Sequence, residues 1–419
     1  MIPHIVFDMQ GFTFGSRPEL TASRLAPIQV NFLVYPGTSG ATFIDYIMTD
    51  KYVTPSEHVK DYTEKMAFLP RSYQVNYYDD DTKKHLLRQS TRTSSPFHYL
   101  SKEQGDSSEQ TVIVKETTRT TLRGSVQWKE KRIQEGLDPS TNVFVFANFN
   151  KQDKIDPMTF SSWMQIMMQV PNSILWLLEP SSHDHHHSKS SSPRTDTSTT
   201  TTTSPSPTNN EVQENIHKQA QNKYGISKSR IQFAKRVSKL KHLERMFVAD
   251  LFLDTFLYGA HSTATDALMG GLPLLTVSFG NSFASRVGVS LLKHLNLGGN
   301  EEEEDDCCID DYFIATSERE FVDRAVEIAR NETASVHTSR DNGNDDDGEG
   351  QPVKTMLSKF RAHLEQKSED KYISLFDTEG YTNDLERMSK LMWEVHKVTG
   401  GDTMHIILVC PSQGDRVVC

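Results

Sequence analysis

Apolar and polar positions alternate along this chain in two blocks, each with the character of a globular domain. In the first block, short apolar runs at 4–7, 28–34 and 43–48 are separated by glycine, proline and polar residues. This pattern is typical of buried strands joined by loops and a helix. The next segment has no such pattern and is rich in Asp, Thr, Arg and Ser. We therefore expect a first domain over 1–80 and an irregular connector over 81–125.

The second block opens near residue 141 with the apolar run 143–146. A continuous apolar run is expected where a strand of a parallel sheet is buried on both faces. The same kind of run recurs along the block, and each recurrence is separated from the next by a helical pattern. Further strands are therefore expected at 174–178, 230–233, 249–254 and 272–277.

The segment after the first of these strands predicts a helix with a defined start. Asp156 is a good N-cap, and Pro157 suits the first helical position. The residues that follow at a spacing of three and four place one apolar stripe on the core. They are Trp163, Ile166, Met167 and Val170.

Strand and helix alternation of this kind predicts an α/β fold with a doubly wound sheet, whose ligands bind beyond the carboxyl ends of the strands. We assign 126–399 to this second domain and 400–419 to a tail. Three polar inserts interrupt the domain and cannot bury enough apolar surface to offset their ordering entropy. We expect disordered loops at about 181–210, 298–310 and 338–352.

Composition narrows the class of protein. Hydrophobic residues make up 36% of the chain, which suggests ordered domains diluted by polar inserts. The net charge is −11, so no global positive field favours binding of nucleic acid or an anionic membrane. No signal peptide or membrane-spanning run is visible, and the four cysteines lack metal-ligand or disulfide-framework spacing. We expect an intracellular protein, cytoplasmic or nuclear, without a metal site. The histidine-rich stretch 183–187 lacks the second ligand group that a functional metal site needs.

Two loops carry candidate chemistry. The first, 148–157, follows a buried strand and precedes the capped helix, so Lys154 there is placed to meet a diphosphate. The second runs from Asp254 into a helix that begins near Ser262, where unpaired amides and the helix dipole form an anion site. Asp266 lies one turn in, on the face of Ser262, where a carboxylate can accept from ribose hydroxyls. From these residues alone, an ordinary capped core helix remains the alternative.

Several motifs occur in an order that resembles a known family. They include NFNxxxKIDP, PNSILWLL, ADLFLDTxLxxxHSTxxDALxxGLPLLT and FASRVGVSLL, with YPGTSGATF in the first block and LFDTEGYTNDLERMSKLMWE at 375–394. The chain is similar, over about 1–80 and 126–399, to the catalytic region of protein O-linked N-acetylglucosamine transferases, including the SPINDLY-like members. The helical repeats that recruit protein substrates in that family are not found here.

The resemblance implies a GT-B arrangement of two facing Rossmann-like domains, the first one incomplete. It implies inverting, metal-independent transfer of N-acetylglucosamine from UDP-N-acetylglucosamine to Ser/Thr hydroxyls of intracellular proteins. The partners would be protein acceptors and the UDP-sugar, with no further cofactor, nucleic acid or membrane.

The same resemblance implies roles for individual residues. Lys154 matches the lysine that stabilises the leaving diphosphate, and His261, Ser262 and Thr263 match the diphosphate-binding loop. Asp266 matches the carboxylate that binds the ribose. Further matches are Lys239, His242 and Arg245, which would hold ribose and uracil, and Thr13, which would face the cleft.

Three positions depart from the family or stay open. Lys151 and Gln10 stand where the family often has Gln and Asn, so sugar contacts there differ. Asp8 ends a strand and is either a turn-capping residue or a catalytic or sugar-contacting carboxylate.

The family's first domain begins before the point that matches Met1, and its base-bearing HPxxHL segment has no counterpart here. We therefore expect the natural protein to be longer and these 419 residues alone not to transfer sugar.

Two alternatives remain at this point. One is a protein O-fucosyltransferase that uses GDP-fucose, against which His242 and Arg245 favour a uracil donor. The other is a non-catalytic nucleotide-binding remnant, which the missing base-bearing segment favours and the presence of Lys154, His261 and Asp266 disfavours.

Overall fold

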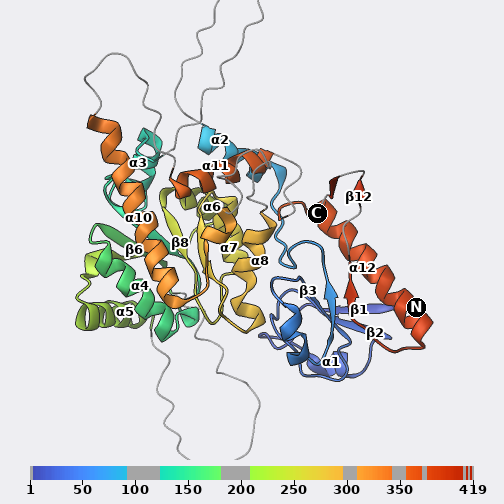
Figure 1. Ribbon diagram of the computed structural model, residues 1–419. Coiled ribbons are helices and arrows are strands. Elements are labelled where there is room, and N and C mark those ends of the chain that lie inside the picture. Colours follow the sequence, from blue (N-terminus) through green and yellow to red (C-terminus); the bar gives the residue numbers. More distant parts are fainter. Residues whose placement is uncertain are drawn as a thin grey trace, which may run out of the picture.

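The computed structural model describes residues 3–91, 123–180, 208–295, 309–341, 355–369, 375–408, 412–413 and 416–417. Within them the chain forms two parallel sheets, which lie side by side with their helices in Figure 1. The three inserts expected from the sequence lie largely outside these residues, and so does the histidine-rich stretch. No helix in the described ranges has the length and apolar character that crossing a membrane requires.

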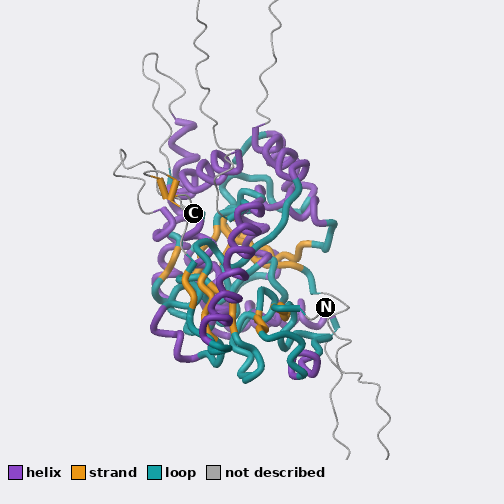
Figure 2. The backbone as a smooth tube through the Cα atoms, turned by 90° about the vertical axis from the view of Figure 1, so that its right-hand side faces the viewer, coloured by secondary structure: helices purple, strands orange, loops and turns teal. Residues whose placement is uncertain are grey.

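The first sheet has five parallel strands in the order β1-β2-β3-β4-β11. They are β1 (Ile5–Asp8), β2 (Ile28–Asn31), β3 (Tyr46–Thr49), β4 (Lys65–Phe68) and β11 (Ile406–Ile407). The first three strands coincide with the three apolar runs of the sequence. Helix α1 (Pro18–Ala22) links β1 to β2, whereas a loop without a helix links β2 to β3. Figure 2 shows the strands in orange among the purple helices, with teal loops between them.

Two strands of this sheet were not anticipated. β4 is short, and its first residue is a lysine that follows a glutamate, so its apolar run is too brief to stand out. β11 lies in the segment expected to be a tail, and Ile406 pairs with Ala67 of β4. The C-terminal segment therefore contributes an edge strand to the first sheet.

The helix α12 (Thr378–Thr399) packs against β2 of the first sheet, although its residues were assigned to the second domain (Figure 1). The guanidinium of Arg71 holds its start through ion pairs with Asp377 at 3.1 Å and Asp384 at 2.7 Å. The helical pattern predicts an apolar face on α12 but does not say which sheet that face covers. The structure assigns the face to the first sheet.

The second sheet has six parallel strands in the order β10-β9-β8-β5-β6-β7. They are β5 (Phe144–Asn148), β6 (Ser173–Leu178), β7 (Ile231–Ala234), β8 (Leu251–Leu253), β9 (Leu274–Val277) and β10 (Ile314–Ala315). Every side chain of the adjacent strands β5 and β6 is buried, as expected for a parallel sheet covered on both faces. The predicted strand–helix alternation is confirmed from β5 to β9.

The helices of this domain surround its sheet (Figure 1). Asp156 accepts hydrogen bonds from the amides of Met158 and Thr159, which confirms the predicted start of α4. The helices are α3 (Val126–Gln134), α4 (Pro157–Gln169), α5 (Asn209–Tyr224), α6 (Lys239–Arg245), α7 (Ser262–Met269), α8 (Val287–His294), α9 (Ile309–Tyr312), α10 (Glu318–Asp341) and α11 (Met356–Glu369).

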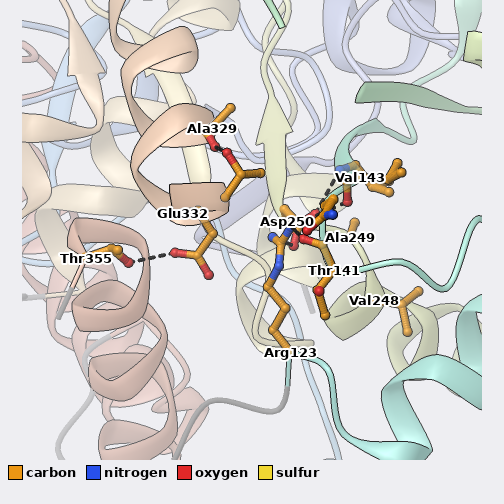
Figure 3. Close-up of polar contacts among 12 residues, drawn as sticks. Arg123, Thr141, Val143, Val248, Ala249, Asp250, Ala329, Glu332 and Thr355 are labelled. Atoms are coloured by element: carbon orange, nitrogen blue, oxygen red, sulfur yellow. Dashed lines mark hydrogen bonds and ion pairs between the residues drawn. The ribbon is translucent and has the colours of Figure 1, made fainter. Parts of the chain in front are cut away.

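The connector expected to be irregular is in part ordered and in part built into the second domain. Helix α2 (Asp80–Thr91) contacts α6 and α11. Arg123 then reaches the fully buried Asp250 at 2.6 Å (Figure 3). Arg132 pairs with the same carboxylate at 2.8 Å. Arg361 of α11 lies 3.7 Å from Asp250. Because a buried carboxylate must be paired, this cluster ties the connector and α11 to the start of β8.

Asp50, at the end of β3, joins the two domains. One of its oxygens, Oδ2, accepts from the amide of Tyr73 at 2.9 Å and from the hydroxyl of Ser290 in α8 at 2.7 Å. Nearby, the guanidinium of Arg286 donates to the carbonyl of Tyr52 at 3.0 Å. The carboxyl end of the first sheet therefore abuts the segment that follows β9 in the second domain.

Candidate active site

The loops that follow β5 and β8 meet because these two strands are neighbours in the second sheet. Lys154 lies at the end of a short 3-10 helix after β5, and its Nζ donates to the carbonyl of Gly259 at 2.8 Å. The same Nζ lies 4.0 Å from the ring centroid of Tyr258. Burial lowers the pKa of Lys154 to about 8, and the nearby carboxylate of Asp254 partly opposes that effect. An ammonium in this setting is poised to gain from an arriving anion.

Asp254 organises the loop that holds these groups. Its Oδ1 accepts from the amides of Thr255 at 2.8 Å and Ala260 at 2.7 Å, and its Oδ2 accepts from the hydroxyl of Thr276 at 2.7 Å. A side chain at Gly288 would approach that Oδ2 to 2.8 Å, so only glycine leaves the arrangement undisturbed. Sequence reasoning did not select Asp254, although it lies within the LDT motif that precedes the loop.

The helix α7 begins at the predicted position, with His261 as its N-cap residue. The imidazole Nε2 lies 3.1 Å from the carbonyl of Ala284. Because a carbonyl oxygen only accepts, Nε2 carries the hydrogen and donates the hydrogen bond. Burial, reinforced by the charge of Lys154, lowers the pKa of His261 to about 3, which keeps the ring neutral at pH 7. Ser262 is exposed and Thr263 is half-buried. The first turn of α7 therefore presents hydroxyls, and its amides have no acceptor within the helix.

Asp266, one turn into α7, is nearly buried and has two partners from other elements. The hydroxyl of Tyr78 donates to its Oδ1 at 2.6 Å, and Lys239 of α6 forms an ion pair with the same oxygen. The structure thus brings together Asp266 and Lys239, which were both selected from the sequence. It adds Tyr78, which lies 188 positions away along the chain and which no local pattern could reveal.

His242 and Arg245, on α6, differ in their surroundings. The ring of His242 packs edge-on against Phe149 at 5.2 Å, and burial together with Arg245 lowers its pKa to about 4. Arg245 is only 1% exposed; it donates to the carbonyl of Lys235 at 2.7 Å and pairs with Glu135 at 3.3 Å. We expected this guanidinium to hold the nucleotide directly. In the structure it also supports the backbone beyond β7, and its contact with the nucleotide stays a prediction.

The residues selected in the first domain form a turn at the carboxyl end of β1. Asp8 Oδ1 accepts from the amides of Gln10 at 2.9 Å and Gly11 at 3.0 Å, which is the turn-capping arrangement. The hydroxyl of Thr13 donates to the carbonyl of Gln10 at 2.8 Å. Gln10 and, across in the second domain, Lys151 are exposed. These three hydrogen bonds of the turn do not involve the groups around Lys154.

Taken together, the second domain gathers two cationic side chains, a neutral histidine, a helix N-terminus and a carboxylate at one edge of its sheet. This set can bind a diphosphate through Lys154 and the start of α7, and a polyhydroxyl group through Asp266. Among the described residues, no three His, Cys, Asp or Glu side chains converge to hold a metal ion.

Comparison with known proteins gives matches over most of the chain. A family model described as glycosyl transferase family 41 matches residues 2–143, 130–199 and 207–335. A probable UDP-N-acetylglucosamine–peptide N-acetylglucosaminyltransferase of Arabidopsis thaliana, SEC, is 28% identical over 94% of this chain and 29% of its own length. The Caenorhabditis elegans protein described as the same transferase is 28% identical over 93% of this chain and 34% of its own.

A solved structure of a Thermobaculum terrenum O-GlcNAc transferase mutant superposes with a TM-score of 0.61. It is 19% identical and covers 95% of this chain and 54% of that one. This likeness and the two parallel sheets confirm the predicted α/β fold with two Rossmann-like domains. The chain spans about a third of the length of the curated relatives it matches.

Proposed function

The chain belongs to glycosyl transferase family 41, and from that premise we propose that it provides the donor site for transfer of N-acetylglucosamine from UDP-N-acetylglucosamine to Ser/Thr hydroxyls of proteins. The observation that carries the proposal is the meeting of Lys154, the loop of Tyr258 and the start of α7 beyond the carboxyl ends of β5 and β8. The names of the matched relatives in Arabidopsis and Caenorhabditis support the same donor and acceptor class.

The chemistry follows from where charge develops. The acceptor oxygen attacks the anomeric carbon from the face opposite the nucleotide, so the new bond has inverted configuration, and the acceptor proton passes to a general base. The bond between the anomeric carbon and the diphosphate oxygen breaks, and its electron pair stays on UDP. Lys154 and the amides of Ser262 and Thr263 then face an oxygen that becomes more negative, so they stabilise the transition state more than the ground state. Fixed cationic and N–H donors take the role that a metal ion has elsewhere.

The nucleoside end is held by a second group of residues. The carboxylate of Asp266, oriented by Tyr78 and Lys239, accepts from ribose hydroxyls. His242 lies on the same side of the domain, packed on Phe149. Arg245 acts indirectly, since its bond to the carbonyl of Lys235 fixes the backbone beside the base. On the family resemblance we place the activity in the cytoplasm or nucleus, which cell fractionation tests.

Calorimetry with UDP, GDP and uridine tests the proposal on the 419-residue chain. We expect UDP to bind, uridine to bind more weakly, and GDP to bind least. Hydrolysis of UDP-N-acetylglucosamine then separates an enzyme from a protein that only binds the nucleotide. A preference for GDP, or no UDP binding by a chain that melts cooperatively, would overturn the assignment of the donor.

A further inference from the structure

The loop between β8 and α7 places an aromatic ring at the centre of the candidate site, at a position that the family resemblance leaves open. In the pattern LDTxLxxxHST, Tyr258 falls on an unspecified position. Resting on the proposed function, we propose that Tyr258 is a positioning residue of the diphosphate site, which holds the Lys154 ammonium and the His261 ring in the arrangement that receives UDP.

The backbone of this loop is fixed from both sides. The hydroxyl of Thr255 donates to the carbonyl of Tyr258 at 2.6 Å, and the amide of Gly259 donates to the carbonyl of Ala284 at 2.9 Å. The next residue, Ala260, is tied to the buried carboxylate of Asp254 at 2.7 Å. The ring of Tyr258 therefore stands on a rigid support, while 36% of the residue remains exposed.

The ring contacts both functional groups at once. Lys154 Nζ lies 4.0 Å from its centroid, and the imidazole of His261 stacks on it at 4.9 Å with an interplanar angle of 23°. These two groups come from different elements, the loop after β5 and the start of α7. The ring is thus a shared wall that sets the spacing between the cation and the helix N-terminus.

The physical role of the ring is electrostatic as well as steric. The negative face of an aromatic ring attracts an ammonium within about 6 Å of its centroid. The charged groups around Lys154 are Asp254, Asp153 and Lys151. The pKa of the Tyr258 hydroxyl is raised, first by burial and then by Asp153 and by Tyr35 of the first domain. Burial disfavours the charged form of Lys154, so the ring offsets part of that cost and keeps the ammonium in one conformer before UDP arrives.

Five variants of the full chain test this role with UDP and uridine as probes. Tyr258→Leu removes the π face, and Tyr258→Phe keeps it. Leu257→Ala, at an exposed neighbour in the same loop, controls for general loosening. Lys154→Met, alone and combined with Tyr258→Leu, provides a double-mutant cycle.

We expect Tyr258→Leu to weaken UDP binding about fivefold, the size of a partly desolvated cation–π contact. Tyr258→Phe and Leu257→Ala should remain within about twofold of wild type, and uridine affinity should not change in any of these variants. In the Lys154→Met background, Tyr258→Leu should have a smaller further effect, because the contact of the ring with Lys154 is gone and only its stacking on His261 remains.

The direction of the pH profile adds a readout that a structural role would not give. If the ring stabilises the ammonium, Tyr258→Leu moves the alkaline loss of UDP affinity to lower pH. If the substitution only loosens the loop, water reaches Lys154 and the loss moves to higher pH.

An equal loss for UDP and uridine, additive effects with Lys154→Met, or a shift to higher pH would overturn the inference while leaving the proposed function intact. No UDP binding by the folded wild-type chain would overturn both. If Tyr258→Leu does not fold, Tyr258→Met gives the same comparison with a flexible side chain.

Discussion

Replacing Lys154 with methionine tests the diphosphate site directly, because methionine keeps most of the apolar stem and removes the charge. In the wild-type chain the ammonium donates to the carbonyl of Gly259 at 2.8 Å, and burial lowers its pKa to about 8. The charged form is therefore costly in the empty site and gains from a diphosphate. Removing the ammonium should weaken UDP binding. It should not lower the melting temperature, because the folded chain then no longer contains a desolvated cation.

The magnitude follows from the hydrogen bond that the ammonium would donate to the diphosphate. A hydrogen bond to a charged group contributes about 1.5–3 kcal/mol, which corresponds to about a 10- to 150-fold change in the dissociation constant of UDP. In an active form of the enzyme, turnover should fall further, by about 10²–10³, because charge on the diphosphate develops in the transition state.

Proton linkage fixes the sign of the pH dependence. Below about pH 8 Lys154 already carries its proton, so UDP affinity does not depend on its titration. Above that pH a proton must be taken up with UDP, so the affinity should fall by up to tenfold per pH unit. His242 and His261, with pKa values of about 4 and about 3, stay neutral from pH 7 upward and add nothing to this slope.

Calorimetry between pH 7 and 9.5, above the last ionisation of the phosphate at about 6, measures both the affinity and the proton uptake. Buffers of different ionisation enthalpy count the proton directly. The slope should vanish in Lys154→Met. A slope that survives the substitution, or a UDP affinity that does not change, would refute the assignment of Lys154 to the diphosphate.

Three further predictions concern the surroundings of the site. His261→Ala should weaken UDP binding less than tenfold in calorimetry, because Nε2 is engaged by Ala284 and the amides of α7 remain; a loss as large as that of Lys154→Met would contradict this. Asp250→Ala should lower the free energy of unfolding in urea by about 3–5 kcal/mol, since it leaves buried guanidinium groups without their carboxylate, and an unchanged midpoint would argue against the cluster. A fragment over 123–369 should bind UDP and melt at a higher temperature than a fragment over 126–399, because the latter lacks Arg123 and contains α12 without β2. A higher melting temperature for 126–399 would contradict the domain boundary drawn from the structure.

The sequence predicts the second sheet well because its strands are buried on both faces. Continuous apolar runs such as that of β5 stand out against the polar loops around them. β4 and β11 escape detection because neither has a long apolar run. β4 begins with a lysine, and β11 has only two residues. Their strand character comes from long-range pairing, of β4 with β3 and of β11 with β4, which local pattern does not encode.

The candidate site was predicted where its residues share a motif and missed where the contact is long-range. Lys154 and the start of α7 could be placed from loop position alone. Tyr78 could not, because it meets Asp266 only through the fold. Arg245 was selected from the family resemblance, and the sequence did not reveal its contacts within the domain, with Glu135 and the carbonyl of Lys235.

The packing of α12 on β2 has a consequence for the order in which the protein is made. The ribosome adds about 5–20 residues per second, so roughly 20–70 s separate the emergence of β2 from that of the helix that covers it. By then every strand of the second sheet, from β5 to β10, has already left the ribosome. The second domain can therefore fold first, while the strands of the first sheet wait for α12. In this chain the order of folding is expected to run against the order of synthesis.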